Sequence, residues 1–209
     1  MCFELGHWPS HFKTSMSIII LKPSKELYDS SKYFRLIILL NTIEKLIEKV
    51  ISNWLQLHSI SNNFIHPSQL GGLKQRSMSD AGITPTHFIR SGWIKNNMTS
   101  TLAFDITQFF PSLNHWLLLL ILRKAGFNSK VDCFFSNYLV ERKTQYFWNN
   151  FSSLFFNVDI EVEQGSALSP ILSVLYLAPI LHILEKCLKI LKSLRLSVIY
   201  SRQQGDYHR

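Results

Sequence analysis

The chain has 209 residues, of which 46% are apolar, and it carries 22 Lys and Arg against 14 Asp and Glu, a net charge of +8. The apolar content excludes a disordered chain, and the length suits one ordinary domain, or two small ones, with a buried core. The positive charge favours polyanionic partners such as nucleic acid or an acidic membrane surface, although a basic protein with no nucleic-acid role is as consistent with charge alone.

The N-terminal residues, the cysteines and the apolar runs indicate in which cellular compartment the protein is expected. Cys2, Cys133 and Cys187 have no paired spacing, which argues against disulfides and Cys-based zinc sites. The first 25 residues lack the features of a signal peptide. The longest apolar runs, 116–122 and 170–181, are shorter than the roughly 20 residues that span a bilayer. The sequence therefore predicts an intracellular, non-secreted protein outside the membrane, with both runs as buried helices.

In chain order, "SMSIIILKPSK" predicts a short strand ended by Pro23, and "KYFRLIILL" a second extended run. A helix follows over Asn41–His58, with Asn41 as N-cap and Glu44 placed to reach back to it. Its apolar residues recur at three- and four-residue spacing, which predicts a buried stripe: Ile43, Leu46, Ile47, Val50, Ile51, Trp54 and Leu55. Its charged residues are predicted to face outward: Glu44, Lys45, Glu48 and Lys49.

The remaining elements mix helices and strands. Gly71 and Gly72 predict a turn, and Ser79 predicts the cap of a helix running towards Lys95. "STLAFDI" suits a buried strand, and Pro111 is placed where a helix can begin. The later segments predict two short helices, two strands joined by an Asn/Ser-rich turn, and a long apolar helix: "NHWLLLLILRKAGF", "KVDCFFSNYLVER", "KTQYFWNNFSSLFFNVDIEVEQGS" and "LSPILSVLYLAPILHILEKCLKIL". Because strands and helices do not alternate regularly, the predicted class is α+β.

Asp105 in "TLAFDITQFFPS" is a lone carboxylate at the end of an apolar strand. Burying a carboxylate is costly unless it is paired or holds a cation, so the position suits a metal ligand. A capping or salt-bridged Asp at a strand end is the simpler interpretation when this feature is taken by itself.

Two further features are compatible with nucleotide binding. In "EQGSALSP", Gly165 lets the backbone approach a ligand closely, while Gln164 and Ser166 supply polar groups before a helix. An ordinary turn with an N-cap explains the same pattern. Lys22 and Arg35 are fixed cations near strand ends, which suit a triphosphate, although such side chains are usually only solvated.

The order of these motifs resembles the reverse transcriptases of non-LTR retrotransposons. The resemblance extends to about Leu191, and the Asp-x4-Phe and Gln-Gly-Ser-x-x-Ser-Pro boxes are its most specific parts. The motifs that carry it, in order, are "ILKPSK", "YFRLIILLNTIEKLIEKVISNWL", "QLGGLKQRSMSDAG", "TLAFDITQFFPSLNH" and "EQGSALSPILSVLYLAPIL".

The resemblance implies a partial right-hand polymerase fold within residues 1–209, comprising fingers, an incomplete palm and no thumb. The implied divisions are fingers at about 17–100, palm at about 101–200 and a divergent tail at 196–209. It implies that Asp105 is a catalytic aspartate that binds Mg²⁺ together with the Ile106 carbonyl, and that Phe110 lies under the nucleotide sugar. It also implies dNTP contacts from Gln164, Gly165, Lys22 and Arg35.

The implied activity is RNA-directed DNA synthesis by two-metal transfer of dNTPs to a primer 3′-hydroxyl, with Mg²⁺ as cofactor. The implied partners are an RNA template and a DNA primer, with no membrane. Basic and aromatic side chains would follow the nucleic-acid backbone, unless they are simply exposed: Lys74, Arg76, Arg90, Trp93 and Lys95.

The chain departs from the family pattern at two places. Where an aromatic-x-Asp-Asp hairpin is expected, Tyr200 is followed by Ser201, Arg202 and Gln203. A guanidinium there would repel Mg²⁺, so these 209 residues are expected to lack polymerase activity. The alternative function is that of a catalytically dead relic that at most binds nucleic acid through a basic surface. Leu36 follows Arg35 where the family has Pro, which predicts a looser fingertip turn.

Overall fold

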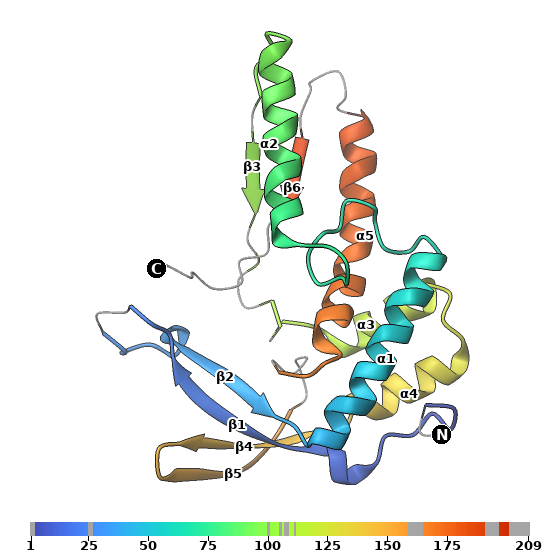
Figure 1. The fold of residues 1–209 in the computed structure, drawn as a ribbon. Coiled ribbons are helices and arrows are strands. Elements are labelled where there is room, and N and C mark those ends of the chain that lie inside the picture. The colour runs from blue at the N-terminus through green and yellow to red at the C-terminus, as the bar shows by residue number, and fades with distance from the viewer. Residues whose placement is uncertain are drawn as a thin grey trace.

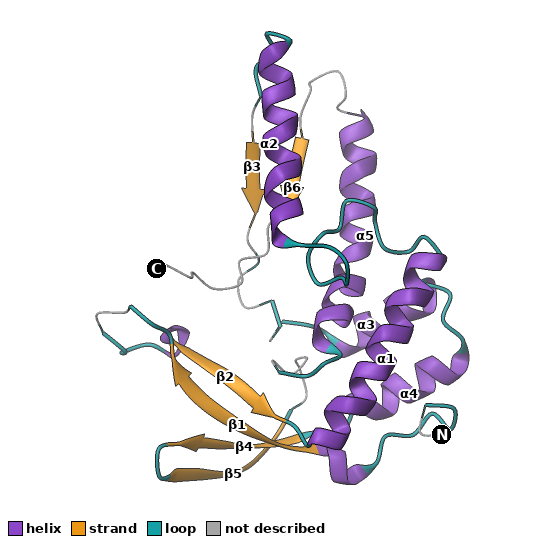
Figure 2. Cartoon of the chain, in the orientation of Figure 1, coloured by secondary structure: helices purple, strands orange, loops and turns teal. Residues whose placement is uncertain are grey.

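The computed structural model describes residues 3–24, 27–99, 101–104, 106, 109–110, 112–158, 165–190 and 197–200. Helices and strands are mixed, as predicted for an α+β protein (Figures 1 and 2). In chain order the strands and α-helices are β1 (Thr14–Leu21), β2 (Phe34–Leu39), α1 (Thr42–Ser61), α2 (Met78–Ile94), β3 (Thr101–Phe104), α3 (His115–Lys124), α4 (Ser129–Leu139), β4 (Lys143–Trp148), β5 (Phe151–Asn157), α5 (Ser169–Ile190) and β6 (Ser197–Tyr200). Two 3₁₀ turns, Ser10–Lys13 and Ser31–Tyr33, precede β1 and β2.

Two separate sheets organise the strands. The larger has the order β2-β1-β4-β5, in which β1 pairs antiparallel with β2 and parallel with β4. The smaller consists of β3 and β6 in parallel, and Figure 1 shows this pair away from the larger sheet. Leu36 pairs with Ile19 in unbroken register. Leucine keeps the backbone N–H that proline lacks, and the looser turn expected from this residue stays a prediction.

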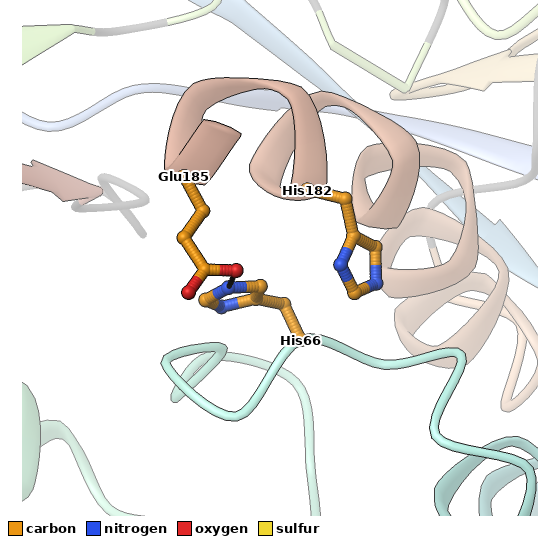
Figure 3. Close-up of side chains that lie close together, drawn as sticks. All are labelled: His66, His182 and Glu185. Atoms are coloured by element: carbon orange, nitrogen blue, oxygen red, sulfur yellow. Dashed lines mark hydrogen bonds and ion pairs between the residues drawn. The ribbon is translucent and has the colours of Figure 1, made fainter. Parts of the chain in front are cut away.

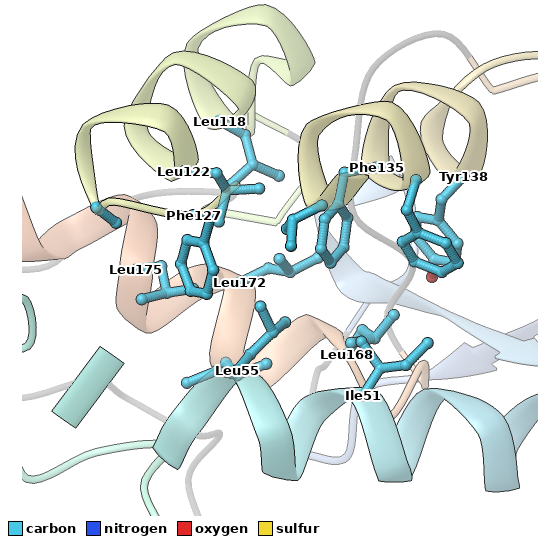
Figure 4. Close-up of a cluster of buried hydrophobic side chains, with 14 of the residues drawn as sticks. Ile51, Leu55, Leu118, Leu122, Phe127, Phe135, Tyr138, Leu168, Leu172 and Leu175 are labelled. Atoms are coloured by element: carbon cyan, nitrogen blue, oxygen red, sulfur yellow. The ribbon is translucent and has the colours of Figure 1, made fainter. Parts of the chain in front are cut away.

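The main core lies between four helices, α1, α3, α4 and α5 (Figure 4). Its fully buried side chains come from every one of these helices and from Trp8 near the N-terminus. The apolar runs at 116–122 and 170–181 therefore form buried helices over much of their length, as predicted. Representative members are Leu55, Leu118, Leu122, Phe134, Phe135, Ile171 and Leu172.

The face of α1 that points inward differs from the prediction. Asn41 caps the helix by accepting a hydrogen bond from the Ile43 N–H, as expected. However, Glu44 and Glu48 are 1% and 0% exposed, whereas Ile43 is 61% exposed. Leu46, Val50 and Leu57 are exposed as well.

The physical reason is that the two carboxylates find buried partners from other parts of the chain. Glu44 forms an ion pair with Arg142 instead of reaching back to Asn41. Glu48 accepts hydrogen bonds from Tyr138 and Ser166. These contacts lower the cost of removing both charges from water, and the exposed apolar residues then follow from helical geometry.

Helix α2 begins two residues earlier than predicted, with Ser77 and not Ser79 as its cap. Ser77 and Asp80 form a reciprocal capping box, in which the Ser77 N–H donates to Asp80 and the Asp80 N–H donates to Ser77 Oγ. The hydrogen bonds from the Ser77 backbone and hydroxyl hold the pKa of the Asp80 carboxyl below its usual value. Both partners of the box are needed to fix the start, which explains why a serine by itself was a weak signal.

Helix α5 qualifies, by length and composition, as a candidate membrane span over Ser169–Cys187. The sequence analysis compared only the apolar run 170–181 with the length of a membrane span, whereas the helix continues beyond residue 181. Its first turns lie in the core, where Ile171, Leu172 and Leu175 are almost fully buried. Core helices of globular domains pass the same test, so the signal is weak.

Candidate functional site

Lys22 and Arg35 lie on one face of the β1–β2 hairpin. Arg35 pairs with Ile20, and Lys22 lies two residues beyond Ile20, where its N–H donates to the Tyr33 carbonyl at 2.9 Å. Directly paired residues and alternate residues of a strand share a face, so both cations are on the same side. The backbone register thus places the two residues on one side of the hairpin, and their contact with a triphosphate stays a prediction.

The strand that leads to Asp105 pairs with the last described strand. Phe104 lies opposite Tyr200 in the parallel register of β3 and β6. Asp105 itself and Ser201 follow directly in the sequence and lie outside the described residues. Gln164 and Pro111 also lie outside them, while the Ile106 side chain is exposed.

Phe110 is half-buried and packs against the helical core. Its ring meets that of Phe109 edge-on at 5.7 Å between centroids, and Phe109 in turn meets Tyr176 of α5. The helix after this segment begins at His115 with Asn114 as its cap. The aromatic pair is therefore fixed on α5, close in sequence to both Asp105 and the start of α3.

Gly165 touches the backbone of β2. Its φ is +128°, a value that glycine favours, and a Cβ there would lie 2.5 Å from the Ile38 carbonyl oxygen. The prediction was that this glycine lets a ligand approach. The close passage of β2 is by itself a sufficient reason for a glycine at position 165.

Substituting Gly165 with Ala should lower the free energy of unfolding by about 2–3 kcal/mol, through the clash with Ile38 and the unfavourable φ. Chemical denaturation followed by circular dichroism measures this. Gly71→Ala is the matched control, because nothing lies within 4 Å of the Cβ it would add. Equal stability of the two variants would contradict the close contact seen at Ile38.

Ser166 and Glu48 form a buried network that sequence reasoning missed. Glu48 Oε2 accepts from Ser166 Oγ at 2.7 Å and from the Ala167 N–H at 2.8 Å, while Oε1 accepts from Tyr138 Oη at 2.7 Å. Ser166 was predicted to present its hydroxyl at the mouth of the helix, but it is buried against Glu48. The spacing of Glu48 from Ile51 and Leu55, three and seven residues, was the available signal for its inward position.

A polar cavity of about 210 Å³ adjoins this network. Among the residues that the structure describes, two cations line it, Lys49 and Lys74, and no carboxylate does. Its remaining lining residues are Ser52, Asn53, Gln56, Gly72, Leu73, Ala167 and Pro170. The cavity is therefore suited to an anionic group, with the first turn of α5 as one wall.

The other basic and aromatic residues of the sequence prediction are placed differently. Arg76 donates to the carbonyls of Pro67 and Gln69, so its guanidinium holds the loop after α1. Arg90, Trp93 and Lys95 are exposed at the C-terminal end of α2. The structure thus separates Lys74, which lines the cavity, from these three.

Residues 20–200, most of the chain, match the family model described as reverse transcriptase (RNA-dependent DNA polymerase). The chain belongs to the reverse transcriptase family. Enzymes of this family use divalent metal ions and bind a template, a primer and deoxynucleotides. The mixed α+β fold with its four-stranded sheet fits such a domain.

The chemistry of the residues that follow β3 and β6 does not match the metal requirement of the family. The register aligns Phe104 with Tyr200, and the residues that follow these two in the sequence, Asp105 and Ser201, lie outside the described residues. Arg202 and Gln203 come next, and neither supplies a carboxylate. These positions of the sequence supply one carboxylate and one guanidinium, which do not provide the anionic oxygen ligands that two Mg²⁺ ions require.

Proposed function

We propose that the chain is a reverse transcriptase domain of the non-LTR retrotransposon type that no longer extends primers. The order of its motifs and the family match over residues 20–200 support this origin. Residues of about 17–100 would form fingers, those of about 101–200 an incomplete palm, and 196–209 a divergent tail.

The single observation that carries the loss of activity is the pairing of Phe104 with Tyr200. This register supports the assignment of Tyr200 to the aromatic position that precedes the missing Asp pair. Because Ser201, Arg202 and Gln203 follow it, Asp105 is left as one third of a carboxylate set. We infer no catalytic step for this chain.

The nucleotide contacts proposed for the family remain in part. Lys22 and Arg35, on one face of the fingers hairpin, would hold the triphosphate, and Phe110 would lie under the sugar. Gln164 and Gly165 would contact the nucleotide and template. These groups bind and orient a nucleotide without supplying the missing metal ligands.

Binding of nucleic acid is the second function, and the cavity with Lys49 and Lys74 favours it. Two cations and several amide or hydroxyl groups suit a backbone phosphate, which carries no sequence information. The net positive charge of the whole chain also favours binding of a polyanion such as nucleic acid. Such binding should weaken steeply as salt concentration rises.

Primer extension on an RNA template with Mg²⁺ tests both proposals. The unmodified chain and its Asp105→Ala variant should show the same background level, because the metal site is incomplete in each. Both should shift RNA at low salt. Asp105-dependent extension by the unmodified chain would refute the proposed loss of activity.

Two further variants make the test specific. An Arg202→Asp/Gln203→Asp chain, which places an Asp pair two residues after Tyr200, should gain extension that depends on Asp105. A Lys49→Gln/Lys74→Gln chain should bind RNA more weakly and with a lower dependence on salt. The Lys124→Gln/Lys130→Gln chain, which removes the same charge outside the cavity, is the control for the lysine pair.

A further inference from the structure

Three side chains with metal-binding atoms meet where the loop after α1 crosses α5. His66 comes from the loop, and His182 and Glu185 come from one face of the helix (Figure 3). One ligand atom from each of the three lies within 4.8 Å of the others. His66 is 8% exposed, so the cluster is partly shielded from water.

Hydrogen bonds fix the orientation of both rings. His182 Nε2 lies 2.9 Å from the Phe64 carbonyl oxygen, which can only accept, so Nε2 carries the proton and Nδ1 keeps its lone pair. Metal-binding histidines commonly donate their other N–H to a carbonyl in this way. The ring of His182 stands at 72° to that of His66, with 5.1 Å between centroids.

The carboxylate is oriented by the second histidine. His66 Nε2 lies 3.1 Å from Glu185 Oε2, and His66 Nδ1 accepts from the Ser68 N–H at 3.1 Å. The neutral ring therefore carries its proton on Nε2, between the imidazole and Glu185. A cation in this place would replace a proton that the two groups already share.

We propose that His66, His182 and Glu185 form a Zn²⁺ site that fastens the loop after α1 to α5. Two imidazole nitrogens and one carboxylate oxygen are ligands that Zn²⁺ accepts, with a fourth position for water. Imidazole ligands favour Zn²⁺ over Mg²⁺. His182 and Glu185 are three residues apart on a helix, which places both on the same side.

Two costs limit the affinity. The ligand atoms must move together, because ligands of a tetrahedral Zn²⁺ at about 2.0–2.1 Å are closer to one another than 4.8 Å. When Zn²⁺ takes His66 Nε2, the ring proton is held on Nδ1, and the hydrogen bond from Ser68 is lost. The Nδ1 proton would then face the Ser68 N–H, so the loop must shift, and the site should bind Zn²⁺ more weakly than a preorganised structural centre does.

Binding should stabilise the folded chain specifically. Glu185 is 119 residues from His66 in the sequence, so the three ligands come together only when α5 has docked. An ion that binds the folded state and not the unfolded one raises the melting temperature as its concentration increases. This site is independent of the proposed polymerase origin, because it uses none of the residues assigned to nucleotide binding.

The test is a Zn²⁺ titration of the full 209-residue chain against a chromophoric chelator, with the melting temperature followed in parallel. His182→Gln/Glu185→Gln should weaken Zn²⁺ binding at least about tenfold and abolish the rise in melting temperature. The glutamine amide introduced in place of His182 can still donate to the Phe64 carbonyl, which preserves the fold. His87→Gln, on exposed α2, is the matched control and should bind Zn²⁺ as the unmodified chain does.

A second measurement does not depend on a folded variant. Zinc X-ray absorption on the unmodified chain should show two imidazole ligands and oxygen in the remaining positions. Equal Zn²⁺ affinity in the unmodified and double-variant chains would indicate an adventitious ion only and would overturn the proposal. A zinc spectrum with fewer than two imidazoles, or displacement of Zn²⁺ by millimolar Mg²⁺, would overturn it as well.

Discussion

Replacing Glu48 with Ala should lower the free energy of unfolding by about 3–5 kcal/mol, since each buried donor left without an acceptor costs about 1–3 kcal/mol. The carboxylate is 0% exposed and accepts from Tyr138, Ser166 and the Ala167 backbone. Alanine removes the carboxylate that accepts from all three donors and leaves a cavity between α1 and α5. Urea unfolding followed by circular dichroism is the measurement.

Glu48→Gln separates hydrogen bonding from volume. The Gln carbonyl can keep the bonds from Ser166 and Ala167, and its amide can donate to the Tyr138 oxygen, which both donates and accepts. We therefore expect a loss of only about 1–2 kcal/mol for this variant. Lys45→Ala on the exposed side of the same helix is the control, with an expected change within about 0.5 kcal/mol. A Glu48→Ala chain as stable as the control would show that the network contributes nothing.

Local signals in the sequence predicted most elements. The strand that becomes β1, the cap at Asn41 and the end of α3 before Gly126 each depend on neighbouring residues. The turn between β4 and β5 was also predictable from neighbouring residues, because asparagine tolerates the positive φ that Asn149 adopts there. Such features are set by backbone propensity and need no knowledge of the rest of the fold.

The orientation of α1 and the pairing of β1 with β4 were not predictable in this way. Helical spacing gives the stripe of apolar residues, but the inward face of α1 depends on Arg142, Tyr138 and Ser166, which are distant in sequence. Likewise β1 pairs in parallel with β4, a strand from the far half of the chain. Contacts of this kind arise from packing, and no local window contains them.

In the candidate site, too, some features were predictable from neighbouring residues and others depend on tertiary contacts. Lys22 and Arg35 were singled out from sequence, and the hairpin register places them on one face. The role of Gly165 was not predictable, because the Ile38 carbonyl it touches belongs to another element. The His66 cluster was missed as well, since His66 and His182 come together only through tertiary structure.

Replacing Arg142 with Met should lower the free energy of unfolding by about 3–5 kcal/mol, because it leaves the buried carboxylate of Glu44 without its cation. Arg142 and Glu44 are 2% and 1% exposed at their side chains, with 3.5 Å between Nη2 and Oε1. The guanidinium also lies over the Tyr138 ring at 4.8 Å. Urea unfolding of the single and double variants measures the effect.

The double variant Glu44→Leu/Arg142→Met distinguishes a lost ion pair from lost packing. Apolar replacement of both partners of a buried pair is often neutral, so the double variant should be at least about 2 kcal/mol more stable than Arg142→Met. The pair of Lys13 and Glu141, at 3.9 Å with Glu141 84% exposed, is the control. Glu141→Gln should change stability by no more than about 1 kcal/mol, because water screens the exposed Glu141 carboxylate even though its partner Lys13 is buried. Additive losses in the double variant would mean that Arg142 acts through its contact with Tyr138 and that the charge on Glu44 is compensated elsewhere.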